Sequence, residues 1–170
     1  MGKTAIILGA SGLTGSILLN KLLKDERYNT IKLFSRKKID YGIPVAAATL
    51  AKENKITTFL VVSALGANVK SAIFYNKTKG EMEFEVLQQN ITNTYILQPS
   101  IISGNRKETR IGEKIGLILF KLFQPLFFEK LKKYSITKAN DIALSMISLA
   151  NSTATAVQII TSDKRNFKKL

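Results

Sequence analysis

A tyrosine and a lysine near the middle of the chain have the spacing of an acid–base pair. Tyr75 and Lys79 form a YxxxK pattern, so a helix would place the phenol and the ammonium one turn apart on one face. A neighbouring cation lowers a tyrosine pKa, and such a phenol can exchange a proton with a carbonyl oxygen during hydride transfer involving a nicotinamide. Ser63 directly follows an apolar strand pattern, where its hydroxyl could hold the reacting oxygen. The three residues predict a catalytic group, although YxxxK by itself is more often a packed tyrosine and a solvated lysine.

A glycine-rich stretch near the N-terminus predicts a dinucleotide-binding turn. Residues 9–15 read GASGLTG and stand between a short apolar run, residues 4–8, and a helical pattern. In such a turn Gly9 permits the tight bend, Gly12 lets the backbone approach a pyrophosphate, and Gly15 lets the helix pack close to the strand. The helix N-terminus offers free N–H groups and a partial positive charge to the phosphates. An ordinary strand-to-helix turn is the less favoured alternative.

The residues after the second expected strand bear on the choice of cofactor. A site specific for NAD has Asp or Glu there for the ribose hydroxyls, whereas an NADP site has Arg for the 2′-phosphate. Here residues 35–38 read SRKK, and the first carboxylate is Asp40. Because a planar guanidinium matches phosphate geometry, Arg36 is the better candidate and the expected cofactor is NADPH. A solvated run of charges is the alternative.

The composition excludes several kinds of chemistry. The 170 residues include no cysteine and no histidine, which rules out a thiol nucleophile, a Ser-His-Asp triad and an HExxH zinc site. The 26 basic and 12 acidic side chains give a net charge of +14. This charge favours polyanions without choosing among nucleic acid, anionic lipid and a phosphorylated cofactor. No helix-turn-helix or RNA-binding aromatic pattern accompanies it, so we expect neither a nucleic-acid partner nor a metal site.

Apolar patterns along the chain alternate between strand and helix. Strands are expected at residues 4–8, 30–34, 57–62, 94–97 and 156–160, and helices at 13–23, 41–52, 74–89 and 138–149. Strands that alternate with helices form a parallel sheet covered on both faces. No internal repeat or low-complexity linker divides the chain. The sequence therefore predicts one α/β domain, residues 1–170, with a Rossmann-type doubly wound parallel sheet.

Four motifs in this order resemble the atypical short-chain dehydrogenase/reductases. They are GASGLTG, VVSALGA around Ser63, YNKTK from Tyr75, and LQPSIISGNRKETRIGE from Leu97. The similarity points to NADPH-binding oxidoreductases of the Tat-interacting-protein type, within the NAD-dependent epimerase/dehydratase-like superfamily. It implies a Rossmann fold, with Tyr75 as proton donor and Lys79 beside it. The cofactor-binding residues that it implies are Ser11, Gly12, Leu13, Thr14, Arg36, Lys37, Tyr75, Lys79, Ile102 and Arg110.

The chain departs from this family's pattern at two places. Where the family has an arginine before the proline, this sequence has Gln98, so any role of that charge is lost. Between Lys37 and Tyr41 it also lacks roughly fifty residues, which in the family form two strands and a helix. In a truly shortened fold, the first strand would pair directly with residues 57–62. If a segment has been left out, those strands should lie about 10 Å apart, and we expect this because losing a central strand exposes unpaired backbone.

An apolar stripe at helical spacing follows the last motif. Its members are Ile111, Ile115, Ile118, Leu119, Leu122 and Leu126, with lysines at 114, 121 and 130 beside them. A cover over the substrate crevice is the favoured interpretation. The alternative is an amphipathic element, residues 111–133, that lies on an anionic membrane.

The leading functional hypothesis is an NADPH-dependent reductase of a small carbonyl compound. The alternatives are an NADPH-binding regulatory protein with little turnover and a nucleotide-sugar epimerase or dehydratase. The N-terminus has no export-signal pattern, and no apolar run reaches the length of about 18 residues that a membrane span requires. We therefore expect a cytoplasmic protein.

Overall fold

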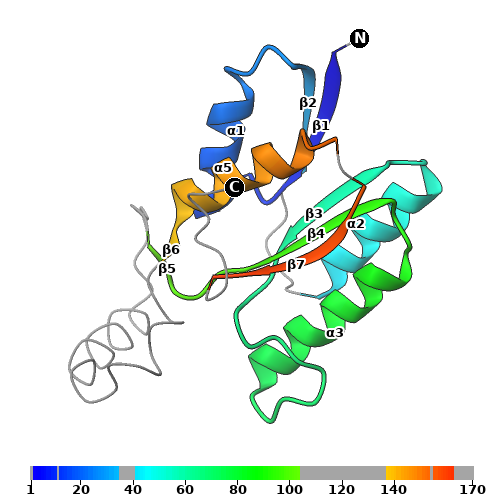
Figure 1. Ribbon diagram of the computed structural model, residues 1–170, viewed down its shortest axis with the longest axis vertical. Coiled ribbons are helices and arrows are strands. Elements are labelled where there is room, and N and C mark those ends of the chain that lie inside the picture. Colours follow the sequence, from blue (N-terminus) through cyan, green and yellow to red (C-terminus); the bar gives the residue numbers. More distant parts are fainter. Residues whose placement is uncertain (1, 11, 35–40, 104–136, 154, 163–170) are drawn as a thin grey trace.

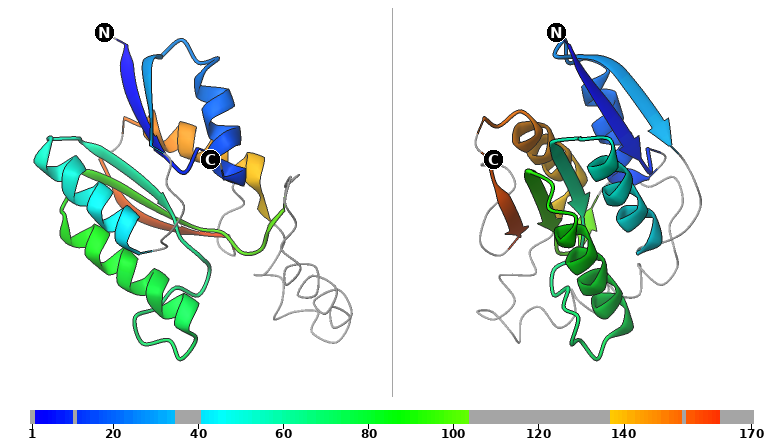
Figure 2. Two further views of the ribbon diagram at one scale, coloured as in Figure 1. Left: turned by 180° about the vertical axis from the view of Figure 1, so that it is seen from behind. Right: turned by 90° about the vertical axis from the view of Figure 1, so that its right-hand side faces the viewer.

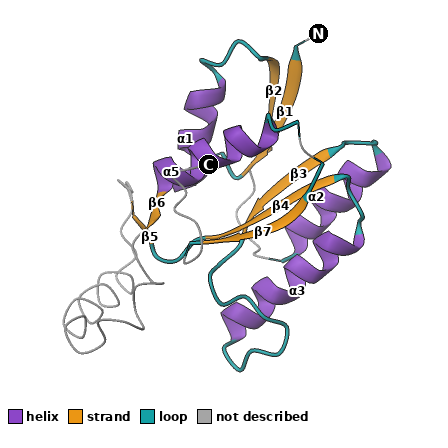
Figure 3. Cartoon of the chain, viewed as in Figure 1, coloured by secondary structure: helices purple, strands orange, loops and turns teal. Residues whose placement is uncertain are grey.

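The computed structural model describes residues 2–10, 12–34, 41–103, 137–153 and 155–162. In chain order the elements are β1 (Lys3–Leu8), α1 (Leu13–Leu22), β2 (Tyr28–Phe34), α2 (Gly42–Glu53), β3 (Thr58–Val62), α3 (Phe74–Gln88), β4 (Asn93–Gln98), β5 (Ile102–Ser103), β6 (Thr137–Lys138), α5 (Ala139–Ala150) and β7 (Val157–Thr161). Figures 1 and 3 show their arrangement. The expected alternation of strand and helix is confirmed, with most boundaries within two residues. The short strands β5 and β6 were not expected, and the apolar stripe at 111–126 lies outside the described residues.

All the strand pairs among the described residues are parallel, but these strands do not form one continuous sheet. β1 pairs with β2, β3 pairs with β4, β4 pairs with β7, and β5 pairs with β6. In the register of the first pair Ile6 lies opposite Lys32, and in the second Leu60 lies opposite Tyr95. Direct pairing of the first strand with residues 57–62 therefore does not occur in the described structure. The expected α/β fold of Rossmann type is confirmed, with a break in the sheet between β1 and β3.

Helices cover both faces of the β3–β4–β7 sheet. On one face Phe59 and Val61 pack against α2 and α3, around Ala48, Met82 and Val86. On the other face Leu60, Val62, Tyr95 and Leu97 pack with Ile142 of α5. Side chains alternate between the faces of a strand, so odd-numbered residues of β3 face α2 and α3, and even-numbered ones face α5.

One helix layer extends across the break in the sheet. Ile7 of β1, Leu22 of α1 and Ile147 of α5 belong to a single apolar cluster, and α1 and α5 contact one another. Figure 2 shows α5 alongside α1 in both views. Since α5 also packs on β3, it connects the two sheets.

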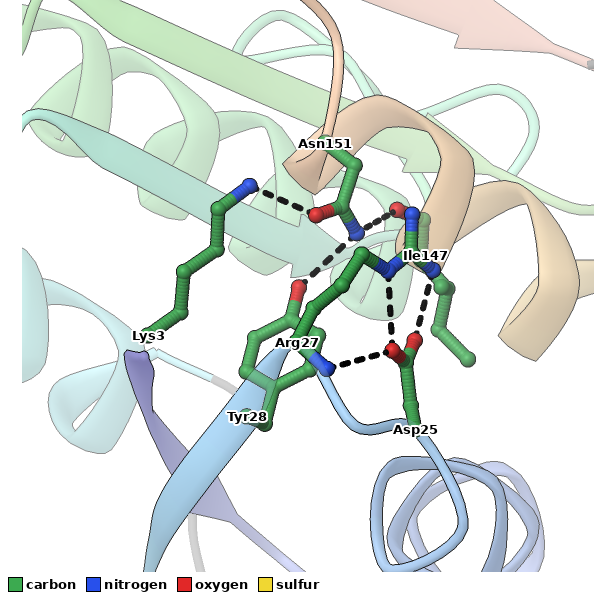
Figure 4. A network of polar contacts seen from close by, with 6 residues as sticks. All are labelled: Lys3, Asp25, Arg27, Tyr28, Ile147 and Asn151. Carbon is green, nitrogen blue, oxygen red and sulfur yellow. Dashed lines mark hydrogen bonds and ion pairs between the residues drawn. The ribbon is translucent and has the colours of Figure 1, made fainter. Parts of the chain in front are cut away.

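A set of polar contacts reinforces this connection (Figure 4). Asn151, just after α5, donates its side-chain N–H groups to the Tyr28 hydroxyl at 3.0 Å and to the Ile147 carbonyl at 2.8 Å. The ammonium of Lys3 donates to the Asn151 side-chain oxygen at 2.6 Å. Asp25 accepts two hydrogen bonds from the Arg27 guanidinium, at 2.8 and 2.6 Å, in the turn before β2. The contacts of Lys3 and Tyr28 with Asn151 tie β1 and β2 to the end of α5, whereas the Asp25–Arg27 pair stays within its own turn.

Candidate functional site

The turn after β1 has the backbone geometry that a phosphate-binding turn requires. Gly9 has φ +74°, a conformation that is costly for residues with a Cβ. The Gly12 amide donates to the Gly9 carbonyl at 2.9 Å and closes the bend. A Cβ added at Gly15 would lie 2.2 Å from the Gly9 carbonyl oxygen, so the helix can approach the strand this closely only with glycine there. The expected roles of Gly9 and Gly15 match this geometry.

The helix that leaves this turn begins without a capping side chain. Gly12 is the N-cap of α1, and no side-chain hydrogen bond caps that end. Leu13 and Thr14 form the first turn and are half-buried. Because the first N–H groups of a helix have no intrahelical partner, this end suits an anion such as a pyrophosphate. The site therefore fits the phosphates of a dinucleotide.

The other expected cofactor residues are placed only in part. Ser11, Arg36, Lys37 and Arg110 lie outside the described residues. Ile102 is half-buried in β5 and packs against the apolar cluster between β4 and α5. The structure therefore leaves the expected contact with a 2′-phosphate as a prediction.

Ser63 and Lys79 are buried, whereas Tyr75 is half-exposed. Ser63 immediately follows β3, and its amide donates to the Leu97 carbonyl at 2.8 Å. Ser63 is 4% exposed, Lys79 is 6% exposed and Tyr75 is 48% exposed. The Lys79 ammonium lies 6.0 Å from the centroid of the Tyr75 ring. The expected one-turn neighbourhood of the phenol and the ammonium is present.

The loop between β3 and α3 fixes where α3 begins. The Leu65 amide donates to the Pro99 carbonyl at 2.9 Å, and the Asn68 amide donates to the Asn76 carbonyl at 3.0 Å. A Cβ at Gly80 would lie 2.3 Å from the Asn68 carbonyl carbon, so helix and loop backbones touch at that glycine. This close packing holds the first turns of α3, with Tyr75, beside the carboxyl end of β3.

Two residues of this region were not expected to belong to the site. Glu83, on α3, is 6% exposed, and Gln98, at the end of β4, is 7% exposed. The Gln98 amide nitrogen donates to both Glu83 carboxylate oxygens, at 2.9 and 3.0 Å. Glu83 follows Lys79 by one helical turn, and this spacing on the face of Tyr75 was the available signal in the sequence.

Burial determines the electrostatics of Glu83. Loss of hydration raises the pKa of its carboxyl above the usual value, while Ser63, Gln98 and the positive charge of Lys79 each oppose that shift. The Ser63 hydroxyl lies close enough to lower this pKa, although it makes no hydrogen bond of standard geometry to any described residue. Both Ser63 and Lys79 therefore neighbour the same buried carboxyl.

The two parts of the candidate site belong to different sheets. The glycine turn follows β1, whereas Ser63, Tyr75 and Lys79 come from β3 and α3. In the right-hand view of Figure 2 the strands of both sheets run downward, so their carboxyl ends lie on the same side of the molecule. Ligands of open α/β sheets bind at that side. Within the described part of the chain, no helix is long and apolar enough to cross a membrane.

Known proteins resemble this chain in sequence over only part of its length. No family model matches the chain. The mitochondrial protein FMP52 of Candida albicans is 45% identical over 81 residues, which are 47% of this chain and 35% of the relative. Mitochondrial FMP52-1 of Scheffersomyces stipitis is 40% identical over 95 residues, and mitochondrial FMP52 of Eremothecium gossypii 32% over 112 residues. These matches cover 54% and 65% of this chain, and 42% and 50% of those relatives. The chain thus spans about a third to a half of their length.

Solved structures share the fold at low sequence identity. The Bordetella bronchiseptica enzyme WbmG, solved with NAD, has a TM-score of 0.61 and 11% identity over 99% of this chain and 76% of its own. The dTDP-4-dehydrorhamnose reductase of Yersinia enterocolitica has a TM-score of 0.65 and 13% identity over 94% of this chain and 74% of its own. The Lactococcus lactis oxidoreductase ylbE has a TM-score of 0.63 and 14% identity over 99% of this chain and 96% of its own. The fold is that of NAD(P)-binding reductases and epimerases.

The comparisons support one expectation only in its wider form and overturn another. The sequence relatives are FMP52 proteins and are not named as the Tat-interacting type, so only the wider resemblance to NAD(P)-binding reductases and epimerases is supported. The expectation of a cytoplasmic protein is wrong, because the relatives are named mitochondrial proteins. The absence of an export-signal pattern could not support a cytoplasmic location, because an export signal directs secretion and says nothing about the choice among compartments inside the cell.

Proposed function

We propose that this chain belongs to an NADPH-binding oxidoreductase that reduces a small carbonyl substrate. The observation that carries the proposal is the turn from Gly9 to Gly15, where the left-handed Gly9 and the close approach at Gly15 leave the uncapped end of α1 open to phosphates. The NAD complex of WbmG, which has the same fold, supports a nicotinamide dinucleotide as the ligand.

The group on α3 would supply the proton for such a reduction. In this proposal the Tyr75 phenol donates its proton to the substrate oxygen, and Lys79 favours the resulting phenolate by its charge. Ser63 orients the substrate oxygen. The cofactor, when bound, supplies the hydride. The half-exposed Tyr75 beside the buried Lys79 suits these roles, because the phenol reaches solvent while the charge stays fixed.

An epimerase or dehydratase acting on a nucleotide sugar is the second candidate. It is favoured by the sugar-nucleotide epimerases among the solved structures with this fold, including a UDP-glucuronic acid 4-epimerase of Bacillus cereus bound to NAD. An NADPH-binding regulatory protein with little turnover would use the same cofactor residues. We also propose a mitochondrial location, on the basis of the names of the sequence relatives.

A cofactor titration tests the leading proposal. Binding of NADPH and NADH, followed by nicotinamide fluorescence, should show tighter binding of NADPH to the unmodified chain. Arg36→Ala should remove most of this preference, at about 1.5–3 kcal/mol for one charge-assisted contact. Equal affinities in the unmodified chain would exclude NADPH specificity, and absence of binding by either cofactor would reject the proposal. A screen of carbonyl compounds with bound NADPH then separates a reductase from a regulatory binder.

A further inference from the structure

Lys79 and Glu83 are the only charged side chains that are buried in the part of the chain that the structure describes. They carry opposite charges and stand four residues apart on α3, a spacing at which side chains of one helix face meet. Lysine and glutamate are almost never fully buried unless they are paired, because each loses its hydration. The proposed reaction uses Lys79 but gives Glu83 no role.

Helical spacing places Tyr75, Lys79 and Glu83 along one face of α3. The three residues follow one another at intervals of four, so their side chains lie one above the other. Glu81 and Glu85, the other acids of α3, stand two residues to either side of Glu83, about 200° around the helix. Glu83 is therefore the acid of α3 that shares a face with the tyrosine and the lysine.

The sheet beneath α3 fixes the Glu83 carboxylate. Gln98, at the end of β4, donates its amide to both carboxylate oxygens at 2.9 and 3.0 Å. Ser63, after the neighbouring strand β3, lies beside the same carboxyl. Both side chains belong to the sheet face that α3 covers, two residues along their strands from Val61 and Ile96. Because both side chains are uncharged, they orient the carboxylate without neutralising it, and its charge stays available to Lys79.

We propose that Glu83 is a positioning residue for Lys79: the carboxylate, held by Gln98, keeps the buried ammonium beside the Tyr75 ring. This role rests on the proposed function, in which Tyr75 donates a proton and Lys79 favours the phenolate. Without the carboxylate, burial would leave the ammonium without this compensation, so the flexible lysine stem would carry it toward water. The phenol would then lose the nearby cation that makes it a better acid.

Glu83 should act on Tyr75 mainly through this lysine. Eight residues separate Glu83 from Tyr75, or about 12 Å along the helix axis. The Lys79 ammonium lies much closer, 6.0 Å from the centroid of the Tyr75 ring. A carboxylate that acted directly on the phenol would disfavour the phenolate, whereas one that holds the ammonium in place favours it. The two roles therefore predict opposite effects when the charge of Glu83 is removed.

Titration of Tyr75 distinguishes these roles in the full chain without cofactor or substrate. The ultraviolet absorbance of tyrosinate is measured against pH, and subtraction of the same chain with Tyr75→Phe isolates Tyr75 from the other four tyrosines. Glu83→Gln keeps the side-chain size and should raise the Tyr75 midpoint by about half a pH unit or more, roughly a threefold loss of acidity. Lys79→Met should raise it as well, and adding Glu83→Gln to Lys79→Met should raise it no further.

Three further variants separate positioning from general stability. Glu83→Asp keeps the charge, so it should restore most of the midpoint even if it lowers the stability of the fold. Glu81→Gln removes one charge from the far side of α3 and should leave the midpoint unchanged. Gln98→Met frees the carboxylate from its two hydrogen bonds, so it should raise the midpoint and serves as the second test if Glu83→Gln does not fold.

Three results would overturn the proposal. In the first, Glu83→Gln leaves the Tyr75 midpoint unchanged or lowers it. In the second, Glu83→Gln raises the midpoint equally in the Lys79→Met chain, so that its effect does not pass through the lysine. In the third, Glu81→Gln causes the same rise. If the midpoint rises as expected but no carbonyl compound is reduced, the positioning of Lys79 stands and the proposed reductase activity fails.

Discussion

Gln98 donates its side-chain amide to both oxygens of the Glu83 carboxylate, at 2.9 and 3.0 Å, in a region where both side chains are buried. The amide satisfies the oxygens but brings no charge. Lys79, one helical turn before Glu83, is the positive group that lowers the carboxyl pKa. Loss of hydration outweighs these contributions, so the pKa of Glu83 is raised. This pair therefore links the stability of the fold to pH.

The first prediction concerns that link. A carboxyl whose pKa is raised in the folded state binds more protons there than in the unfolded chain. The free energy of unfolding should therefore fall as the pH rises from 4.5, the ordinary pKa of a glutamate, through the raised pKa of Glu83. Glu83→Gln keeps the side-chain size and removes the titration. Its free energy of unfolding, measured in urea between pH 4.5 and 7.5, should lack this fall.

The chain offers clean conditions for this measurement. It contains no histidine, the side chain that ordinarily titrates between pH 5 and 8. Glu81→Gln, on the same helix and paired with Lys77 at 4.0 Å, controls for the loss of one glutamate charge. If both variants change the pH dependence of the unfolding free energy equally, the burial of Glu83 does not cause that dependence.

The sequence predicted the order and type of the main elements because their apolar patterns are local. The run at residues 4–8 followed by the glycines gave β1 and its turn, and Pro44 lies in the first turn of α2, where proline is tolerated. Pairing between strands depends on distant residues. The sequence therefore left two arrangements open for residues 57–62, and the structure excludes direct pairing with β1.

The candidate site was predictable where residue type and spacing together carry the information, as at Gly9, Gly15, Tyr75 and Lys79. The spacing of Glu83 places it on the same helix face, but its residue type argues against a buried site, because a glutamate on a charged helix is usually solvated. Its burial depends on β4 passing beneath α3. Gln98 was read only as the loss of a family charge, whereas in the fold it is the partner of Glu83.

A second prediction separates the two structural glycines of the phosphate turn. Gly15→Ala would place a Cβ 2.2 Å from a backbone oxygen that cannot easily move, so it should cost about 3 kcal/mol or more of unfolding free energy. Gly9→Ala meets no atom within 4 Å but keeps φ +74°, and should cost about 1–2 kcal/mol. Asn20→Ala, at an exposed position of the same helix, is the control. Urea denaturation measures all three, and equal costs at Gly9 and Gly15 would show that the helix can move away from the strand.

A third prediction addresses the proposed chemistry. Tyr75→Phe should lower turnover of a carbonyl substrate by about 10²–10⁴-fold while NADPH binding stays nearly unchanged, because only the transferable proton is lost. Lys79→Ala should weaken both turnover and binding. Lys79→Met keeps most of the buried stem, so it separates the charge from the packing. Steady-state kinetics and cofactor titration provide the two readouts, and full turnover in the Phe variant would remove Tyr75 from the mechanism.

The last prediction concerns the contact that joins β2 to α5. The Asn151 amide donates to the Tyr28 hydroxyl at 3.0 Å, and Tyr28→Phe removes that acceptor with no other change of shape. It should cost about 0.5–1.5 kcal/mol of unfolding free energy. Asn151→Ala should cost more, since the side chain also bonds the Ile147 carbonyl and Lys3. In the double variant the two costs should fall short of additivity by at least about 0.5 kcal/mol, because both substitutions remove the same hydrogen bond.

Lys3→Met, the control, removes only an exposed contact to Asn151 and should cost no more than a few tenths of a kcal/mol, about the value of exposed pairs. Strict additivity of Tyr28→Phe and Asn151→Ala would mean that this hydrogen bond does not hold the two sheets together.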